Sequence, residues 1–160
     1  MDKEDLEKLK DFGQKMKQLN KKFRLLNLLR TAKEEYDKSK FEDCIKTCEE
    51  ALKTDPGNNV ALRGLGCSML SLGRLDDALT YFVMALEHSK NKEIEYTLIG
   101  TIYYLEDNLE QALEYYNLAI DLNDDYDLAY EGRNQTMLEH HLQICDLQDL
   151  LIKQEFSEYN

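Results

Sequence analysis

The sequence predicts an all-α fold, and three observations point to it. The chain has 160 residues but only one proline and seven glycines, so the residues that interrupt helices are nearly absent. Leu, Glu, Lys and Ala, which favour helices, are abundant, and tryptophan is absent. Three consecutive segments of 34 residues also align without a gap. A period of this length is typical of an α-solenoid built from helical hairpins.

The three repeated segments span 25–58, 59–92 and 93–126. Small residues recur in each segment at positions eight, twenty and twenty-seven, where two helices have to approach closely: Ala32, Gly66 and Gly100; Cys44, Ala78 and Ala112; Ala51, Ala85 and Ala119. Each segment also divides at a turn signal into two apolar-periodic stretches of about 12 to 14 residues, the length of ordinary helices. We therefore expect each segment to form one helical hairpin.

The regions before and after the repeats are also expected to be helical. Residues 1–24 form an N-terminal extension. From this extension into the first repeat, apolar residues follow one another at steps of three and four and predict a helix with an apolar seam: Leu9, Phe12, Met16, Leu19, Phe23 and Leu26. After 126 the repeat begins again and fails, because Asn134 takes the small position. We predict one or two capping helices over 127–156 and a frayed tail over 157–160.

The distribution of charge excludes some function classes. The net charge is −12, but residues 1–104 carry 18 basic and 18 acidic groups, whereas 105–160 carry 2 and 14. This balance argues against nucleic-acid binding, which depends on neutralising phosphates. The apolar runs are shorter than the roughly 20 residues of a membrane span, and the first ten residues are charged where a signal peptide would be apolar. We expect a cytoplasmic protein without a membrane span.

The reactive side chains form no recognisable catalytic or metal site. The four cysteines are expected to be reduced: Cys44, Cys48, Cys67 and Cys145. Cys44 and Cys48 are one helical turn apart, as two metal ligands would be, but no histidine lies nearby in sequence and both take core positions of the repeat. The three histidines have no triad partners near them: His88, His140 and His141. We expect no metal, no cofactor and no enzymatic activity.

The third segment, 93–126, has the clearest motif. Bulky, small and aromatic residues occur in it at fixed places: Tyr96, Ile99, Gly100, Tyr103, Ala112, Tyr116 and Ala119. On these positions the three segments resemble the tetratricopeptide repeat family, over about 102 of the 160 residues. The departures from the family pattern are mild, and they include Cys44 and Cys48 in place of an alanine and an aromatic residue.

The resemblance implies a peptide-binding groove lined by the first helix of each repeat. Carried over position by position, its residues are Leu26, Leu29, Arg30, Lys33, Tyr36, Val60, Arg63, Cys67, Leu70, Ile94, Leu98, Thr101, Tyr104, Leu105 and Leu128. Members that grip the acidic C-termini of heat-shock chaperones need polar side chains at five of the family's positions. Here four of the five hold an apolar residue or glycine, which are Leu29, Gly64, Ile94 and Leu98, and only Lys33 fits. The groove is therefore expected to suit an apolar or amphipathic segment with an acidic flank.

The function implied by this resemblance is that of a non-enzymatic adaptor or chaperone, whose partner is a peptide or amphipathic helix of another protein. The architecture is also similar to that of the small acidic chaperones that hold translocator proteins for bacterial type III secretion. An alternative is a self-associating structural protein, in which the N-terminal helix forms a homodimer or fills the groove.

Overall fold

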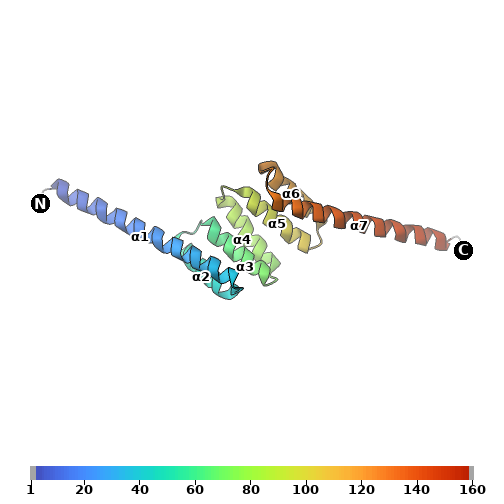
Figure 1. Ribbon diagram of the computed structural model, residues 1–160, viewed down its shortest axis with the longest axis horizontal. Helices are drawn as coiled ribbons and strands as arrows, with labels where there is room; N and C mark the ends of the chain where they lie inside the picture. The colour runs from blue at the N-terminus through green and yellow to red at the C-terminus, as the bar shows by residue number, and fades with distance from the viewer. Residues whose placement is uncertain (1–2, 159–160) are drawn as a thin grey trace. The chain divides into compact units, whose positions relative to one another are not determined.

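The computed structural model describes residues 3–158, with their side chains from Glu4 to Gln148. Seven α-helices follow one another along the chain (Figure 1): α1 (Lys3–Asp37), α2 (Phe41–Thr54), α3 (Asn59–Ser71), α4 (Leu75–His88), α5 (Lys92–Leu105), α6 (Leu109–Leu122) and α7 (Asp127–Glu158). The described residues contain no strand, so the predicted all-α class is confirmed. None of the described helices is both long and apolar enough to cross a lipid bilayer.

The helices form two compact units, Met1–His88 (unit 1) and Ser89–Asn160 (unit 2). In unit 1, α1 packs on α2, α2 on α3 and α3 on α4, and α1 also contacts α3. In unit 2, α6 packs on both α5 and α7, and α5 also contacts α7. Within unit 1, α2 packs on α1 and α4 on α3, and within unit 2 α6 packs on α5, as expected for helical hairpins.

The period of 34 residues reappears in the backbone. The second helices of the hairpins, α2, α4 and α6, begin at Phe41, Leu75 and Leu109. The turn before each of them contains one residue with positive φ: Ser39 (57°), Gly73 (74°) and Asp107 (60°). The next residue in each turn donates its N–H to a carbonyl five residues back, as from Arg74 to Met69 at 2.9 Å. This left-handed closure stops the first helix of each hairpin. Only Gly73 adopts it without a steric penalty on a side chain.

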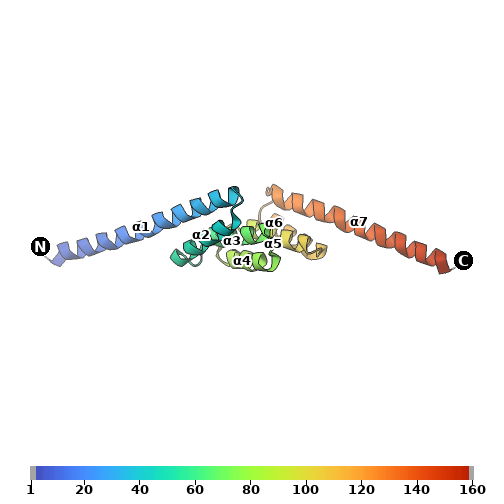
Figure 2. The same ribbon diagram turned by 90° about the horizontal axis from the view of Figure 1, so that it is seen from below.

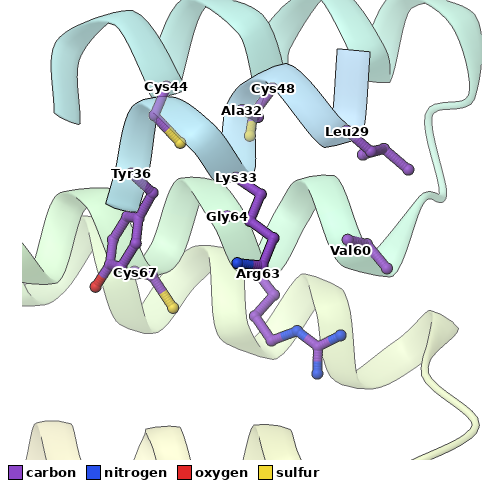
Figure 3. A pocket seen from close by; sticks show the side chains of 10 residues that line it. All are labelled: Leu29, Ala32, Lys33, Tyr36, Cys44, Cys48, Val60, Arg63, Gly64 and Cys67. Atoms are coloured by element: carbon purple, nitrogen blue, oxygen red, sulfur yellow. The ribbon is translucent and has the colours of Figure 1, made fainter. Parts of the chain in front are cut away.

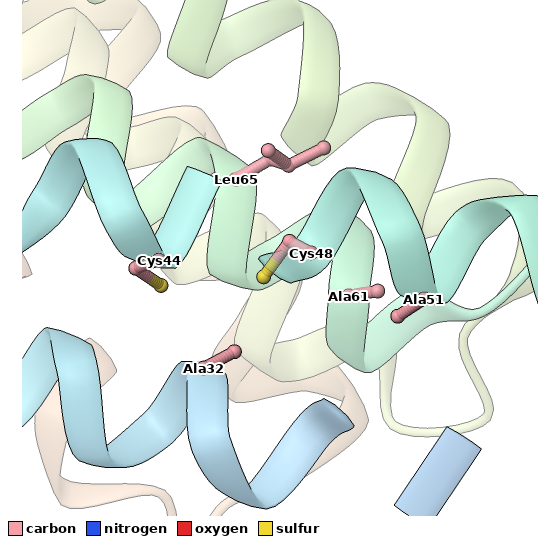
Figure 4. Close-up of a cluster of buried hydrophobic side chains, with 6 residues drawn as sticks. All are labelled: Ala32, Cys44, Cys48, Ala51, Ala61 and Leu65. Carbon is pink, nitrogen blue, oxygen red and sulfur yellow. The ribbon is translucent and has the colours of Figure 1, made fainter. Parts of the chain in front are cut away.

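Small residues allow close helix packing, as the repeat pattern predicts. Figure 4 shows a cluster of buried side chains in unit 1: Ala32, Cys44, Cys48, Ala51, Ala61 and Leu65. In the second repeat, a Cβ on Gly66 would overlap the ring of Phe82, which is fully buried. In unit 2, the ring of Tyr116 leaves no room for a Cβ on Gly132 of α7, which would lie 2.5 Å from it. The close approach in α7 is therefore made by Gly132 and not at Asn134, the position that the repeat predicts.

Both flanking regions are long continuous helices. The sequence boundary expected between residues 24 and 25 lies inside α1, which runs without a break from Lys3 to Asp37. The capping region is one helix, α7, and it continues to Glu158. The last two residues of the expected tail lie outside the described residues. The N-terminal part of α1 projects beyond the ends of α2 and α3 and does not fold back over these helices (Figures 1 and 2), and Arg24 still pairs with Glu50 of α2.

Candidate functional site

Unit 1 contains a cavity of about 280 Å³ between α1, α2 and α3 (Figure 3). Its lining comes from all three helices: Leu29, Ala32, Lys33 and Tyr36 of α1, Cys44 and Cys48 of α2, and Val60, Arg63, Gly64 and Cys67 of α3. Most of these side chains are apolar or small. The cavity therefore offers a mainly apolar surface with two cationic side chains.

The cavity exists because the first repeat lacks an aromatic ring. Position twenty-four holds Phe82 in the second repeat and Tyr116 in the third, and both rings are almost completely buried. The first repeat has Cys48 at this position, which is equally buried but much smaller. The volume that a ring fills in the other repeats is therefore open here. The side chains around it do not close it, because the packing of three helices holds them in place.

The cysteine side chains keep the cavity wall apolar. Burial raises the pKa of the Cys48 thiol well above its ordinary value of 9.0, and the neighbouring Cys44 raises it further. The thiol is therefore uncharged near neutral pH, and it behaves as a small hydrophobic group. No set of three or more His, Cys, Asp or Glu side chains within the described part of the chain is arranged to hold a metal ion.

Two cations lie at the cavity, one on each of two helices. The Lys33 ammonium donates to Asp37 Oδ2 at 2.7 Å, and this contact raises the pKa of Lys33. Lys33 therefore stays charged at physiological pH. Arg63 lies on α3, and Figure 3 shows its side chain on the same side of the cavity as that of Lys33. A carboxylate near the cavity would meet positive charge from both helices.

Tyr36 is held in place at the cavity by one contact of its hydroxyl and one of its ring. Its hydroxyl is 3.2 Å from Ser71 Oγ, which connects the end of α1 to the end of α3. Its ring meets the edge of Phe41 with centroids 5.4 Å apart. These contacts fix the ring, so this part of the cavity wall is preformed.

Six of the fifteen sequence-predicted groove residues line this cavity: Leu29, Lys33, Tyr36, Val60, Arg63 and Cys67. The prediction missed Cys44 and Cys48, because it took groove residues only from the first helix of each repeat. The signal that could have found them was the replacement of an aromatic residue by Cys48. In unit 1 the remaining predicted residues, Leu26, Arg30 and Leu70, are not part of the cavity wall.

In unit 2, the predicted groove residues belong to a different environment. Ile94, Leu98, Thr101 and Tyr104 are half-buried, and Leu105 and Leu128 are exposed. The Tyr104 hydroxyl donates to Glu139 Oε2 at 2.6 Å and accepts from Gln135 Nε2 at 3.0 Å. Both partners lie on α7, so Tyr104 helps to hold this helix.

Comparison with protein families gives one match. Residues 96–126, which comprise most of α5 and all of α6, match the model of the tetratricopeptide repeat. The chain is also similar to anaphase-promoting complex subunit 3 of Schizosaccharomyces pombe, with 29% identity over 123 residues. That alignment covers 75% of this chain but only 18% of the subunit, so the chain spans less than a fifth of this relative.

Solved structures show the same fold. The first TPR domain of Spaghetti (RPAP3) bound to the HSP90 peptide SRMEEVD is 16% identical, with a TM-score of 0.68 over 74% of this chain and 94% of that chain. The Yersinia enterocolitica type III secretion chaperone SycD, in complex with a peptide of the translocator YopD, is 17% identical, with a TM-score of 0.66 over 72% and 94%. The Sgt2 TPR domain from Aspergillus fumigatus is 15% identical, with a TM-score of 0.68 over 73% and 79%.

Proposed function

Since this chain is a tetratricopeptide repeat protein, we propose that it is an adaptor or chaperone that binds a segment of a partner protein at the cavity of unit 1. Its function is to hold that segment and not to transform it. Two structural neighbours are described with bound peptides, which supports peptide binding as the mode of action.

The observation that carries this proposal is the missing ring at Cys48. The resulting cavity of about 280 Å³ is at the small end of the range for ligand pockets, so it suits one or two side chains and not an extended ligand. Its apolar wall favours a large apolar or aromatic side chain. Burying such a side chain contributes about 1.5 to 3 kcal/mol before the costs of ordering the peptide.

The two cations define the chemistry next to this anchor. Lys33 and Arg63 favour an aspartate or glutamate close to the anchor in the bound segment. The ion pair between Lys33 and Asp37 does not block this, because both side chains are exposed and such pairs contribute little stability. The expected ligand is therefore a segment with a large apolar residue and an acidic flank. This differs from recognition of a C-terminal carboxylate, for which Leu29 and Gly64 lack the donors.

A peptide selection tests the proposal. A random peptide library displayed on phage would be selected on the full chain, and the enriched peptides would be titrated calorimetrically. We expect enrichment of a large apolar residue close to Asp or Glu. Lys33→Glu and Arg63→Glu should each weaken binding about tenfold or more. Lys46→Glu makes the same charge change at an exposed α2 position outside the cavity, and it should leave the affinity unchanged.

A second variant tests the cavity itself. In the third repeat, the ring of Tyr116 lies between Gly100 and Gly132. Beside Cys48, Gly64 of the second repeat already stands at the place of Gly132, so the double variant Ala32→Gly/Cys48→Phe would complete the same arrangement. Phe is preferred to Tyr because Thr101, whose hydroxyl is 3.2 Å from that of Tyr116, is replaced by Lys33 in the first repeat.

We expect this double variant to keep its helical circular dichroism and to lose binding of the selected peptides, because the new ring occupies the space of the anchor. A folded double variant with wild-type affinity would show that the peptide binds elsewhere. If no peptide enriches on the wild-type chain, peptide binding as the function is contradicted.

A further inference from the structure

The N-terminal part of α1 carries an apolar seam that nothing in unit 1 covers. Its side chains are exposed to 40–66% although they are large and apolar: Leu9, Phe12, Met16, Leu19, Phe23 and Leu26. They follow one another at steps of 3, 4, 3, 4 and 3, which is the heptad spacing of a coiled coil. The next positions of the pattern hold Asp5 and Arg30, so the seam ends in a charged residue on both sides.

We propose that this seam pairs with the same seam of a second copy of the chain in a parallel, two-stranded coiled coil. The proposal does not depend on what binds in the cavity. Most of the stability of a helix in a protein comes from packing its apolar face, and the seam of α1 lacks such packing. Gly13 weakens this helix further, because glycine is unfavourable in the middle of a helix. No atom lies within 4 Å of a Cβ built on Gly13, so close packing does not require a glycine here. Pairing removes the apolar seam from water and supplies the missing stabilisation.

The repeats leave the seam accessible to a second copy. Gln18, Lys21, Lys22 and Leu25 of α1 line a shallow pocket with Thr54 and Asp55 at the end of α2. On a helical wheel Gln18, Lys21 and Leu25 are opposite to the seam, whereas Lys22 lies at its edge. Arg24 also pairs with Glu50 of α2, whereas Leu19 and Phe23 remain more than half exposed. The packing of α1 on unit 1 and the pairing of the seam therefore use different faces.

The charges beside the seam favour the parallel orientation. One edge carries Lys8, Lys15 and Lys22, and the other carries Leu6, Gly13 and Asn20. In a parallel pair, each edge meets the other edge of the partner helix, so lysines face uncharged residues. In an antiparallel pair, like edges meet, and the two rows of lysines would repel each other. Parallel pairing avoids this repulsion.

The same charges favour a second copy over an acidic helix of another protein. The Lys8 ammonium is 2.7 Å from Glu4 Oε1, and the Lys15 ammonium is 2.7 Å from Asp11 Oδ2. Only one edge of the seam carries lysines, so an acidic partner helix would meet no positive charge along the other edge, which holds Leu6, Gly13 and Asn20. The apolar seam still needs a partner, and the seam of a second copy presents the same apolar residue at each level of a parallel pair.

Sedimentation equilibrium of the full chain over a concentration series tests the pairing. We expect a reversible dimer. Leu19→Asp should weaken it about 30-fold or more, because the carboxylate would be buried in the seam. Gln14→Asp adds the same charge on the opposite side of the exposed helix, and it should leave the dimer unchanged. Circular dichroism of both variants would confirm that the repeats remain folded. A monomeric wild type, or a dimer that Leu19→Asp does not weaken, would overturn the proposal.

A disulfide experiment tests the orientation. In a Cys145→Ser background, which removes the exposed native thiol, Leu9→Cys should form a disulfide between copies on mild oxidation, because residue 9 faces residue 9 in a parallel pair. In an antiparallel pair residue 9 would face residue 26, and the two introduced thiols would be about 25 Å apart. A dimer without this disulfide would overturn the parallel arrangement, and a trimer or tetramer would overturn the two-stranded one.

Discussion

Gly66 shows how strongly a single residue controls helix packing, since any side chain at this position would overlap Phe82. We predict that Gly66→Leu lowers the free energy of unfolding by about 3 kcal/mol, because overpacking forces the ring or the helix to move. Gly13→Ala is the matched control, because no atom lies within 4 Å of the added methyl group. It should instead stabilise the chain by about 0.5 to 1 kcal/mol. Urea unfolding measures both, and equal midpoints would contradict the packing described here.

The Cys48 thiol predicts a loss of stability at alkaline pH. Burial raises its pKa in the folded chain, so the unfolded chain ionises this thiol first, near pH 9.0. Below that pH, the uncharged Cys48 thiol therefore makes its full contribution to the free energy of unfolding. This contribution is lost as the pH rises above that value, by at most about 1.4 kcal/mol per pH unit. The measurement is the free energy of unfolding in urea between pH 7 and about 10.

Two variants isolate this effect. Cys48→Ala should flatten the decline with pH, although it lowers stability at every pH by enlarging the cavity. Cys145→Ala removes an exposed thiol and should leave the decline unchanged. A decline of equal slope in all three proteins would show that another group is responsible.

At the scale of elements, α7 is attached to the hairpin of α5 and α6 partly by polar contacts. Besides the bonds of Tyr104, Gln143 Nε2 donates to Asp107 Oδ1 at 2.9 Å, and Asp107 is the positive-φ residue of the turn before α6. His140 Nε2 lies 3.6 Å from Glu110 Oε1. These contacts position the part of α7 that follows the packing of Gly132 on Tyr116.

We predict that Tyr104→Phe loosens this part of α7 without unfolding the hairpin. Loss of the hydroxyl removes the bonds to both Gln135 and Glu139. Hydrogen exchange measured by mass spectrometry should become faster in residues 134–148 and remain unchanged in α6. Glu131→Gln, an exposed change on the same helix, is the control and should leave exchange unchanged. Faster exchange throughout α5 and α6 would mean that Tyr104 supports the core instead.

At the scale of the whole molecule, the two units differ sharply in charge. Unit 1 carries 16 basic and 16 acidic residues, whereas unit 2 carries 4 basic and 16 acidic residues. Repulsion between like charges opposes the compact state of unit 2 and is screened by salt. Unit 1 has no comparable excess of either sign.

We therefore predict that added salt slows hydrogen exchange in unit 2 more than in unit 1. The double variant Asp124→Lys/Asp125→Lys, at two exposed positions, should reduce the response of unit 2. It should change the affinity for a peptide bound in unit 1 less than about twofold, since it lies outside that cavity. Equal salt responses of the two units would show that the acidic residues of unit 2 do not destabilise it.

The sequence by itself determined the helical class, the period of 34 residues and the apolar seam of α1. Each of these depends on spacing along a single chain segment: helix breakers are scarce, small and large residues recur at fixed intervals, and the seam follows a heptad. The small residues expected at close helix contacts include Gly66 and Gly100, and the structure places them against the rings of Phe82 and Tyr116.

Only the tertiary structure decided which side chains form a site. The replacement of an aromatic residue by Cys48 reads in the sequence as a mild departure from the repeat, but its consequence depends on three helices at once. The cavity is the volume that α1, α2 and α3 leave unfilled around Cys48. It depends on the packing of all three helices, so no pattern within one segment of the sequence predicts it. The same reason applies to Tyr104, which was predicted for the groove. Its hydrogen bonds to α7 depend on residues 31 and 35 positions further along the chain, which only folding brings together.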